Sequence, residues 1–133
     1  LSGRWAHTAR VVALHDGTCT GRRGVAAGQT VLLGPTALLQ VGGVQVVVVS
    51  VRQQCKDPVF FEMMGVDLAA ARSVIVKSRG HFRAGFDEFF PDDRIIEVDV
   101  PGLTTPDLRQ VKWQRMPRPM YPLDADMHWS PPQ

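Results

Sequence analysis

The chain has 133 residues, of which 44% are hydrophobic and 21% are charged, and its formal net charge is +2. This composition is typical of a globular chain and argues against intrinsic disorder. At this length one domain can bury a hydrophobic core without support from disulfides or metals. The longest apolar stretch, from Leu38 to Val51, is interrupted by Gly42, Gly43 and Gln45. It falls short of the ~20 residues that a spanning helix needs, so we expect no membrane segment.

Cysteine usage, the N-terminus and the charge distribution bear on location and partners. Cys19 and Cys55 lie far apart and in no metal-ligand spacing, which favours two reduced thiols in a cytoplasmic protein. The N-terminus has no initiator Met and no apolar signal segment, so we expect it to be a domain boundary. Lys and Arg form no block, and residues 87–107 are acidic, so we expect no nucleic-acid partner.

The first part of the chain, to about Val51, is typical of β structure. Strands are predicted at Arg10–His15, Thr30–Leu33, Thr36–Val41 and Val44–Val51. Asp16-Gly17 predicts a tight turn after the first of these strands. Gly42-Gly43 separates two β-rich runs and predicts a hairpin. The run after it is almost entirely β-branched, which predicts a central strand covered on both faces.

After Cys55 short helices and strands alternate. Asp57-Pro58 and Gly65 bracket a helix over Pro58–Met64, and Asp67 is placed to cap one further turn. The next predicted elements are a strand at Ser73–Lys77, a helix over His81–Phe90 with a phenylalanine stripe, and a strand at Arg94–Val100. Strand, helix and strand form a βαβ unit, in which the two strands are parallel. Thr105-Pro106-Asp107 predicts a last, short helical turn.

These elements predict an α/β fold. We expect a mixed sheet, with N-terminal β-hairpins and a C-terminal βαβ unit, in a single domain over residues 1–124 followed by a flexible tail at 125–133. The predicted core residues are Val46, Val48, Ile75, Phe82, Phe86, Ile96 and Val98.

The sequence contains no self-contained catalytic signature. It lacks a phosphate-binding glycine loop, His-Glu-x-x-His, Gly-x-Ser-x-Gly and a cysteine pair with zinc spacing. His15-Asp16 could supply metal ligands, but His and Asp before Gly are common turn residues. Arg22-Arg23 could bind an anion or lie solvated in a loop. Since a tight zinc site needs about three or four converging ligands, we expect no metal site within this chain.

Polar residues gather in one segment, at the end of a predicted strand and the start of the next helix. Lys77 and Ser78 leave the strand, and His81 and Arg83 lie in the first helical turn. This is where α/β folds place their sites, and the N–H groups of a helix start attract anions. The four side chains could therefore point into one cleft. The alternative is that Ser78 caps the helix and that the cationic side chains are solvated.

Four runs of the sequence resemble, in order, the C-terminal domain of MlrC-type proteins, a family named for the bacterial microcystin-degradation protein. These runs are Leu33–Val44, Asp57–Phe61, Val76–Phe86 and Val100–Leu108. The ending Arg118–Asp124 is similar to the usual close of that family. Lys-Ser-x-x-His-Phe-Arg-Ala, which begins at Lys77, is the most specific of the matching motifs.

The resemblance implies the C-terminal domain of a two-domain, zinc-dependent metallopeptidase or amide hydrolase. In that family a larger N-terminal domain holds the metal ligands, so zinc is expected in the full-length protein and the fragment alone is expected to be inactive. We further expect the segment to face that domain and a peptide or amide substrate, with His81 and Arg83 as catalytic residues and Lys77 and Ser78 as substrate-binding residues. Their individual roles stay open, because Lys77 or Arg83 could either stabilise an oxyanion or hold a substrate carboxylate, and His81 could act as proton donor or as oxyanion partner. The alternative is a freestanding, non-catalytic binding module.

Overall fold

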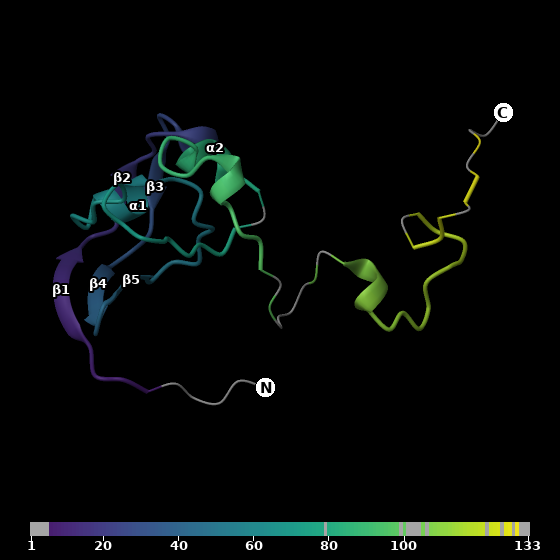
Figure 1. The fold of residues 1–133 in the computed structure, drawn as a ribbon, viewed down its shortest axis with the longest axis horizontal. Helices are drawn as coiled ribbons and strands as arrows, with labels where there is room; N and C mark the ends of the chain where they lie inside the picture. Colours follow the sequence, from purple (N-terminus) through teal and green to yellow (C-terminus); the bar gives the residue numbers. More distant parts are fainter. Residues whose placement is uncertain are drawn as a thin grey trace. The chain divides into compact units, whose positions relative to one another are not determined.

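The computed structural model describes residues 6–78, 80–98, 100, 105, 107–121, 123–125, 127, 128 and 130. The chain divides into two compact units, Leu1–Ile95 (unit 1) and Ile96–Gln133 (unit 2) (Figure 1). The single domain expected over residues 1–124 stays a prediction, and part of the tail expected at 125–133 lies outside the described residues. Among the described residues no helix is long and apolar enough to cross a membrane.

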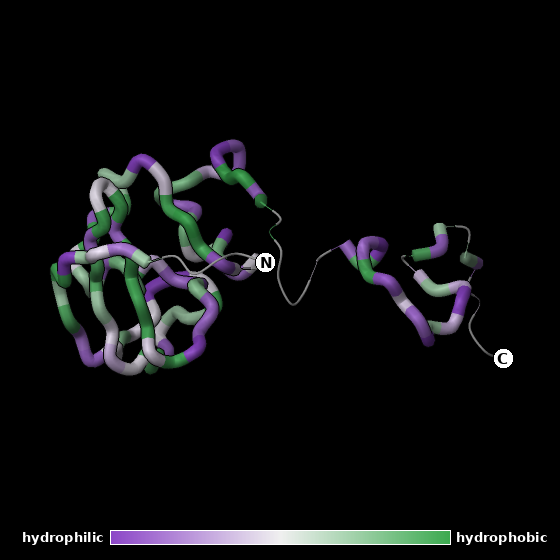
Figure 2. The backbone as a smooth tube through the Cα atoms, turned by 90° about the horizontal axis from the view of Figure 1, so that it is seen from below, coloured by the Kyte–Doolittle hydropathy of each residue, from purple (hydrophilic) through white to green (hydrophobic). Residues whose placement is uncertain are grey.

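Unit 1 contains two antiparallel sheets. The larger sheet has the order β1-β4-β5 and consists of β1 (Arg10–His15), β4 (Thr36–Val41) and β5 (Val44–Val49). The smaller sheet pairs β2 (Thr18–Thr20) with β3 (Thr30–Leu32). Hydrophobic stretches of backbone alternate with hydrophilic ones throughout unit 1 (Figure 2). The predicted hairpin is confirmed, because β4 and β5 pair around Gly42-Gly43.

The position predicted for β5 is wrong. β4 is the central strand, since β1 pairs with its other side and places Arg10 opposite Gln40. Among the described residues no strand pairs with the outer edge of β5. A β-branched run favours extended backbone whether it lies at the centre or at the edge of a sheet, so it predicts the strand but not its place.

The core of unit 1 forms between the smaller sheet and a short helix. α1 (Val59–Glu62) follows Asp57, whose Oδ1 accepts a hydrogen bond from the N–H of Val59 at 2.9 Å. Gly65, with φ of +79°, follows α1 as predicted. The buried core cluster consists of Ala26, Val31, Leu33 and Phe60, with Val49, Cys55, Val59 and Met63 packed against it.

The predicted βαβ unit is not confirmed. The described residues of Ser73–Lys77 and Arg94–Val100 form no strand, and Asp99 lies outside the described residues. Ile75 is 93% exposed. Residues 92–94 form instead the single turn η2 (Asp92–Arg94). An apolar β-branched segment becomes a strand only where another strand pairs with it, and the described part of the chain supplies no such partner.

The helix expected over His81–Phe90 is much shorter in the structure. α2 (Arg83–Phe86) has four residues, with turns on either side. Of the predicted core, Phe86 is buried and Phe82 half-buried. The others are exposed, namely Val46, Val48, Ile75, Ile96 and Val98. Val46 and Val48 lie in β5 on the face of the sheet that points away from the core, whereas the described segments that contain Ile75, Ile96 and Val98 form no strand.

In its described residues, unit 2 has one regular element. Its single turn of 3-10 helix, η3 (Leu108–Gln110), confirms the short turn predicted after Thr105. Asp107 caps the turn, because its Oδ1 accepts a hydrogen bond from the N–H of Arg109 at 3.1 Å. The indole N–H of Trp113 donates to the carbonyl of Leu108 at 2.8 Å and closes the loop behind the turn.

Candidate functional site

The four residues predicted as a site lie within one short segment of unit 1. Lys77 and Ser78 end a stretch without regular secondary structure, His81 lies in a turn and Arg83 begins α2. The N–H of Arg83 donates to the carbonyl of Gly80 at 3.1 Å and forms that turn. Lys77 and His81 are exposed, whereas Ser78 and Arg83 are half-buried. Of these four residues, Lys77 and His81 therefore face solvent, and Ser78 and Arg83 are held by the fold.

Ser78 is held from a distant part of the chain. The side-chain Nε2 of Gln54 donates to its Oγ at 2.8 Å. The N-cap of α2 is Phe82, with no side-chain capping bond, so the alternative in which Ser78 caps this helix is wrong. Sequence reasoning missed Gln54, because a contact across 24 residues leaves no local signal.

Arg83 is fixed on two sides. Its Nη1 donates to Oδ1 of Asp92 at 2.7 Å, and its guanidinium carbon lies 5.4 Å from the centre of the Phe82 ring. A cation over an aromatic face is favourable, and the carboxylate partner compensates part of the charge. Asp92 is itself largely exposed. The position of Arg83 is therefore defined, and an anionic ligand that binds its guanidinium would have to displace Asp92.

A charged network ties the end of α2 to the rest of unit 1. Arg22 pairs with Glu62 through Nε–Oε2 and Nη2–Oε1 distances of 3.0 and 2.8 Å, and also with Glu88. Arg23 pairs with Asp87 at 2.6 Å. The hydrogen bond from Arg22 is the largest factor that lowers the pKa of Glu88. Both arginines thus bind carboxylates of their own chain, which leaves no support for the anion-binding interpretation.

A buried carboxylate holds the two arginines from the other side. Asp57 is fully buried, and its Oδ2 accepts hydrogen bonds from the backbone N–H groups of Arg22 and Arg23 at 2.7 and 2.8 Å. Burial is the main effect that raises the pKa of Cys55 to about 12, and the negative charge of Asp57 raises it as well. The Cys55 thiol is therefore protonated at neutral pH and unsuited to act as a nucleophile.

Packing requires a glycine at one position of the Lys-Ser-x-x-His-Phe-Arg-Ala-Gly run, Gly85. A Cβ on Gly85 would lie 2.5 Å from the carbonyl oxygen of Lys56, closer than any normal contact. The α2 backbone therefore packs directly on the segment that leads into α1. Figure 1 shows α1 and α2 in the same part of unit 1, beside β2 and β3.

His15 and Asp16 act as turn residues. Nδ1 of His15 accepts a hydrogen bond from the N–H of Gly17, and Oδ1 of Asp16 accepts one from the N–H of Thr18, both at 2.9 Å. Gly17 has φ of +80°, and a Cβ there would meet the carbonyl of Gly34. Within the part of the chain that the structure describes, no group of three or more His, Cys, Asp or Glu side chains could hold a metal ion.

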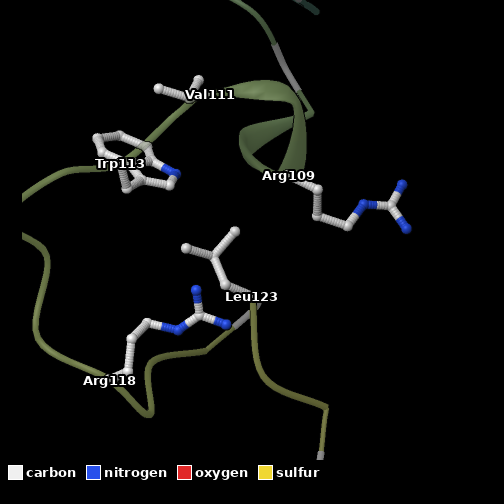
Figure 3. Close-up of a pocket in the computed structure, with 5 residues that line it drawn as sticks. All are labelled: Arg109, Val111, Trp113, Arg118 and Leu123. Atoms are coloured by element: carbon white, nitrogen blue, oxygen red, sulfur yellow. The ribbon is translucent and has the colours of Figure 1, made fainter.

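Unit 2 carries a pocket of about 210 Å³ that the sequence did not predict (Figure 3). It is lined by Arg109, Val111, Trp113, Arg118 and Leu123. Both arginines are paired with acidic side chains of the same unit: Arg109 Nε with Asp107 and Arg118 Nε with Asp124, at 2.7 and 2.6 Å. The hydrogen bond from the paired arginine side chain is the largest factor that lowers the pKa of each aspartate to about 2. The guanidinium charges are therefore compensated within the unit.

Comparison with known proteins identifies the family. A family model described as the MlrC C-terminus matches residues 2–115, which is most of the chain. Neither the search of curated proteins nor the search of solved structures gave a match. The matched range includes Asp57, Gln54 and the whole Lys77–Arg83 segment. The chain therefore belongs to the family of MlrC C-terminal domains.

Proposed function

We propose that this chain is the accessory C-terminal domain of a bacterial, cytoplasmic MlrC-type peptide or amide hydrolase. In this proposal it closes the active-site cleft of an N-terminal metal-binding domain. The observation that carries the proposal is the Lys77–Arg83 segment, in which the most specific family motif lies at the surface of unit 1 with Ser78 and Arg83 held in place. In this proposal zinc would be held by the N-terminal domain, as the family resemblance implies.

The chemistry of amide hydrolysis gives the segment its proposed roles. Attack on the amide carbon places negative charge on the carbonyl oxygen, and preorganised donors beside that oxygen are worth roughly 3–4 kcal/mol each. Arg83 is a charged donor in a defined position. His81 is exposed and can stabilise the oxyanion or protonate the leaving amine. Lys77 and Ser78 would bind the substrate, Lys77 through a carboxylate and Ser78 through its Gln54-oriented hydroxyl.

The test is substitution in the full-length protein. We expect His81→Ala and Arg83→Ala each to lower turnover of a peptide or amide substrate by ~100-fold or more, with unchanged melting temperature. Arg94→Ala is the matched control, because Arg94 is an exposed arginine close in sequence and outside the motif. Near-normal turnover in both variants would show that the segment is a solvated turn, and would favour the alternative of a non-catalytic binding module.

A further inference from the structure

One face of the β1-β4-β5 sheet carries only apolar side chains. Residues directly opposite each other in antiparallel strands share a face, and the register pairs Leu39 with Val46 and with Val11, and Ala37 with Val48 and with Leu14. We call this surface the outer face. Its side chains are those of Val11, Leu14, Ala37, Leu39, Val41, Val44, Val46 and Val48.

The opposite, inner face is the one that packs on the core of unit 1. Leu38 on that face is 2% exposed, and Val49 packs against the core cluster. On the outer face Leu14 is 76% exposed and Val44 is 61% exposed. An antiparallel sheet with one covered face normally carries polar residues on the other. In Figure 1 both helices of unit 1 lie with β2 and β3, so neither covers β1 from outside.

The size of the outer face indicates what kind of partner covers it. Strands of six residues are ~20 Å long and three of them are ~14 Å wide, so the flat outline of the face is about 300 Å²; its accessible area, which follows the side chains, is larger but of the same order. Stable dimers of separate chains bury about 800 Å² on each partner, so a second copy on this face alone would bind weakly. Interfaces between domains of one polypeptide bury only about 300–750 Å² per side, and the linker raises the effective concentration of the two partners, so an apolar face of this size is sufficient for docking within one chain.

We propose that the outer face is the docking surface for the N-terminal domain of the same polypeptide. This inference rests on the two-domain organisation of the proposed function and names the surface through which the domains join. Because the outer face has no charged or hydrogen-bonding side chain, the surface that covers it must be an uncharged, aliphatic helix or sheet layer.

The experiment compares two adjacent residues of β5 in the full-length protein. Val44 lies on the outer face and Gln45 on the inner one, and both are exposed. We expect Val44→Lys to split a single calorimetric transition into two and to speed proteolytic cleavage between the domains at least tenfold, whereas Gln45→Lys leaves both unchanged. Leu14→Lys, on another strand of the outer face, should repeat the effect of Val44→Lys. In the 133-residue chain alone, Val44→Lys should leave the melting temperature unchanged, because that side chain is already exposed.

Two results would overturn the inference. One is that Val44→Lys and Leu14→Lys leave the domains as tightly coupled as in the wild type. The other is that the 133-residue chain sediments as a stable dimer that Val44→Lys dissociates, which would make a second copy the occupant. Neither result touches the proposed function, because that is tested by turnover of the His81 and Arg83 variants. Loss of turnover there together with unchanged domain coupling here would leave the hydrolase proposal standing and the docking surface wrong.

Discussion

The buried carboxylate of Asp57 accepts a hydrogen bond from the backbone N–H of Arg22 at 2.7 Å, across 35 residues of the chain. The side chain of the same Arg22 reaches outward to Glu62 of α1 and to Glu88 after α2. The buried carboxylate of Asp57 thus anchors the backbone of the loop that follows β2. The Arg22 side chain of the same loop then links α1 to the residue Glu88 after α2 at the surface. Through Glu88, this arrangement extends to the helix that begins at Arg83.

We expect Asp57→Ala to destabilise unit 1 by roughly 3 kcal/mol, because three backbone N–H groups would lose their acceptor in a buried place. Urea unfolding followed by circular dichroism measures the change. Asp67→Ala is the matched control, since Asp67 also accepts two backbone N–H groups but is exposed, and it should cost about 1 kcal/mol. Equal effects of the two substitutions would contradict a special role for the buried carboxylate.

The features that sequence reasoning predicted correctly are local ones. The Gly42-Gly43 hairpin, the Asp57 cap before α1 and the short turn after Thr105 each depend on residues within a few positions of one another, although the residue that caps the last turn is Asp107. Turn geometry and capping are decided by such neighbours, so the sequence alone is sufficient for them.

Features that depend on distant partners could not be predicted. β1 pairs with the side of β4 that faces away from β5, so β5 lies at the edge of the sheet. This order depends on packing between strands and not on the composition of β5. The apolar segment around Ile75 has the composition of a strand but no strand partner in the described residues. In the candidate site the motif predicted which residues matter, whereas the Gln54–Ser78 and Arg83–Asp92 contacts came only from the folded chain.

The ion pair of Arg22 with Glu88 predicts a pH dependence of stability. The folded-state pKa of Glu88 lies below its ordinary value of 4.5, chiefly because Arg22 donates a hydrogen bond to the carboxylate. A lowered folded-state pKa stabilises the fold above pH 4.5, and this contribution is lost as the pH falls through the folded-state value. We therefore expect wild type to melt above Glu88→Gln at pH 6, with the difference shrinking below pH 4.5.

Melting curves of the two proteins between pH 6 and pH 3 provide the measurement. High salt should also reduce the difference at pH 6, because the pair lies at the surface and is screened. Asp93→Asn is the control, as Asp93 is exposed and forms no ion pair with the described residues. A difference between wild type and Glu88→Gln that stays constant with pH would mean that the pair contributes no stability.

The last prediction concerns the two glycines of the Lys-Ser-x-x-His-Phe-Arg-Ala-Gly run, Gly80 and Gly85. Replacing glycine by alanine in a helix is normally favourable by up to about 1 kcal/mol, because it restricts the unfolded chain. At Gly85 the new Cβ would lie 2.5 Å from the backbone carbonyl oxygen of Lys56, so the contact can be relieved only by moving α2. We expect Gly85→Ala to destabilise unit 1 by about 1–3 kcal/mol, the usual cost of overpacking.

Gly80→Ala is the matched control for this substitution. A Cβ at Gly80 meets no atom within 4 Å, so its effect on stability should stay within about 0.5 kcal/mol. Urea unfolding of the two variants measures the stability change. In the full-length hydrolase that we propose, Gly85→Ala should also lower turnover, since Arg83 moves with α2. A Gly85→Ala variant as stable as the wild type would show that the packing of α2 on Lys56 is loose, and would remove the reason to regard the position of Arg83 as fixed by the fold.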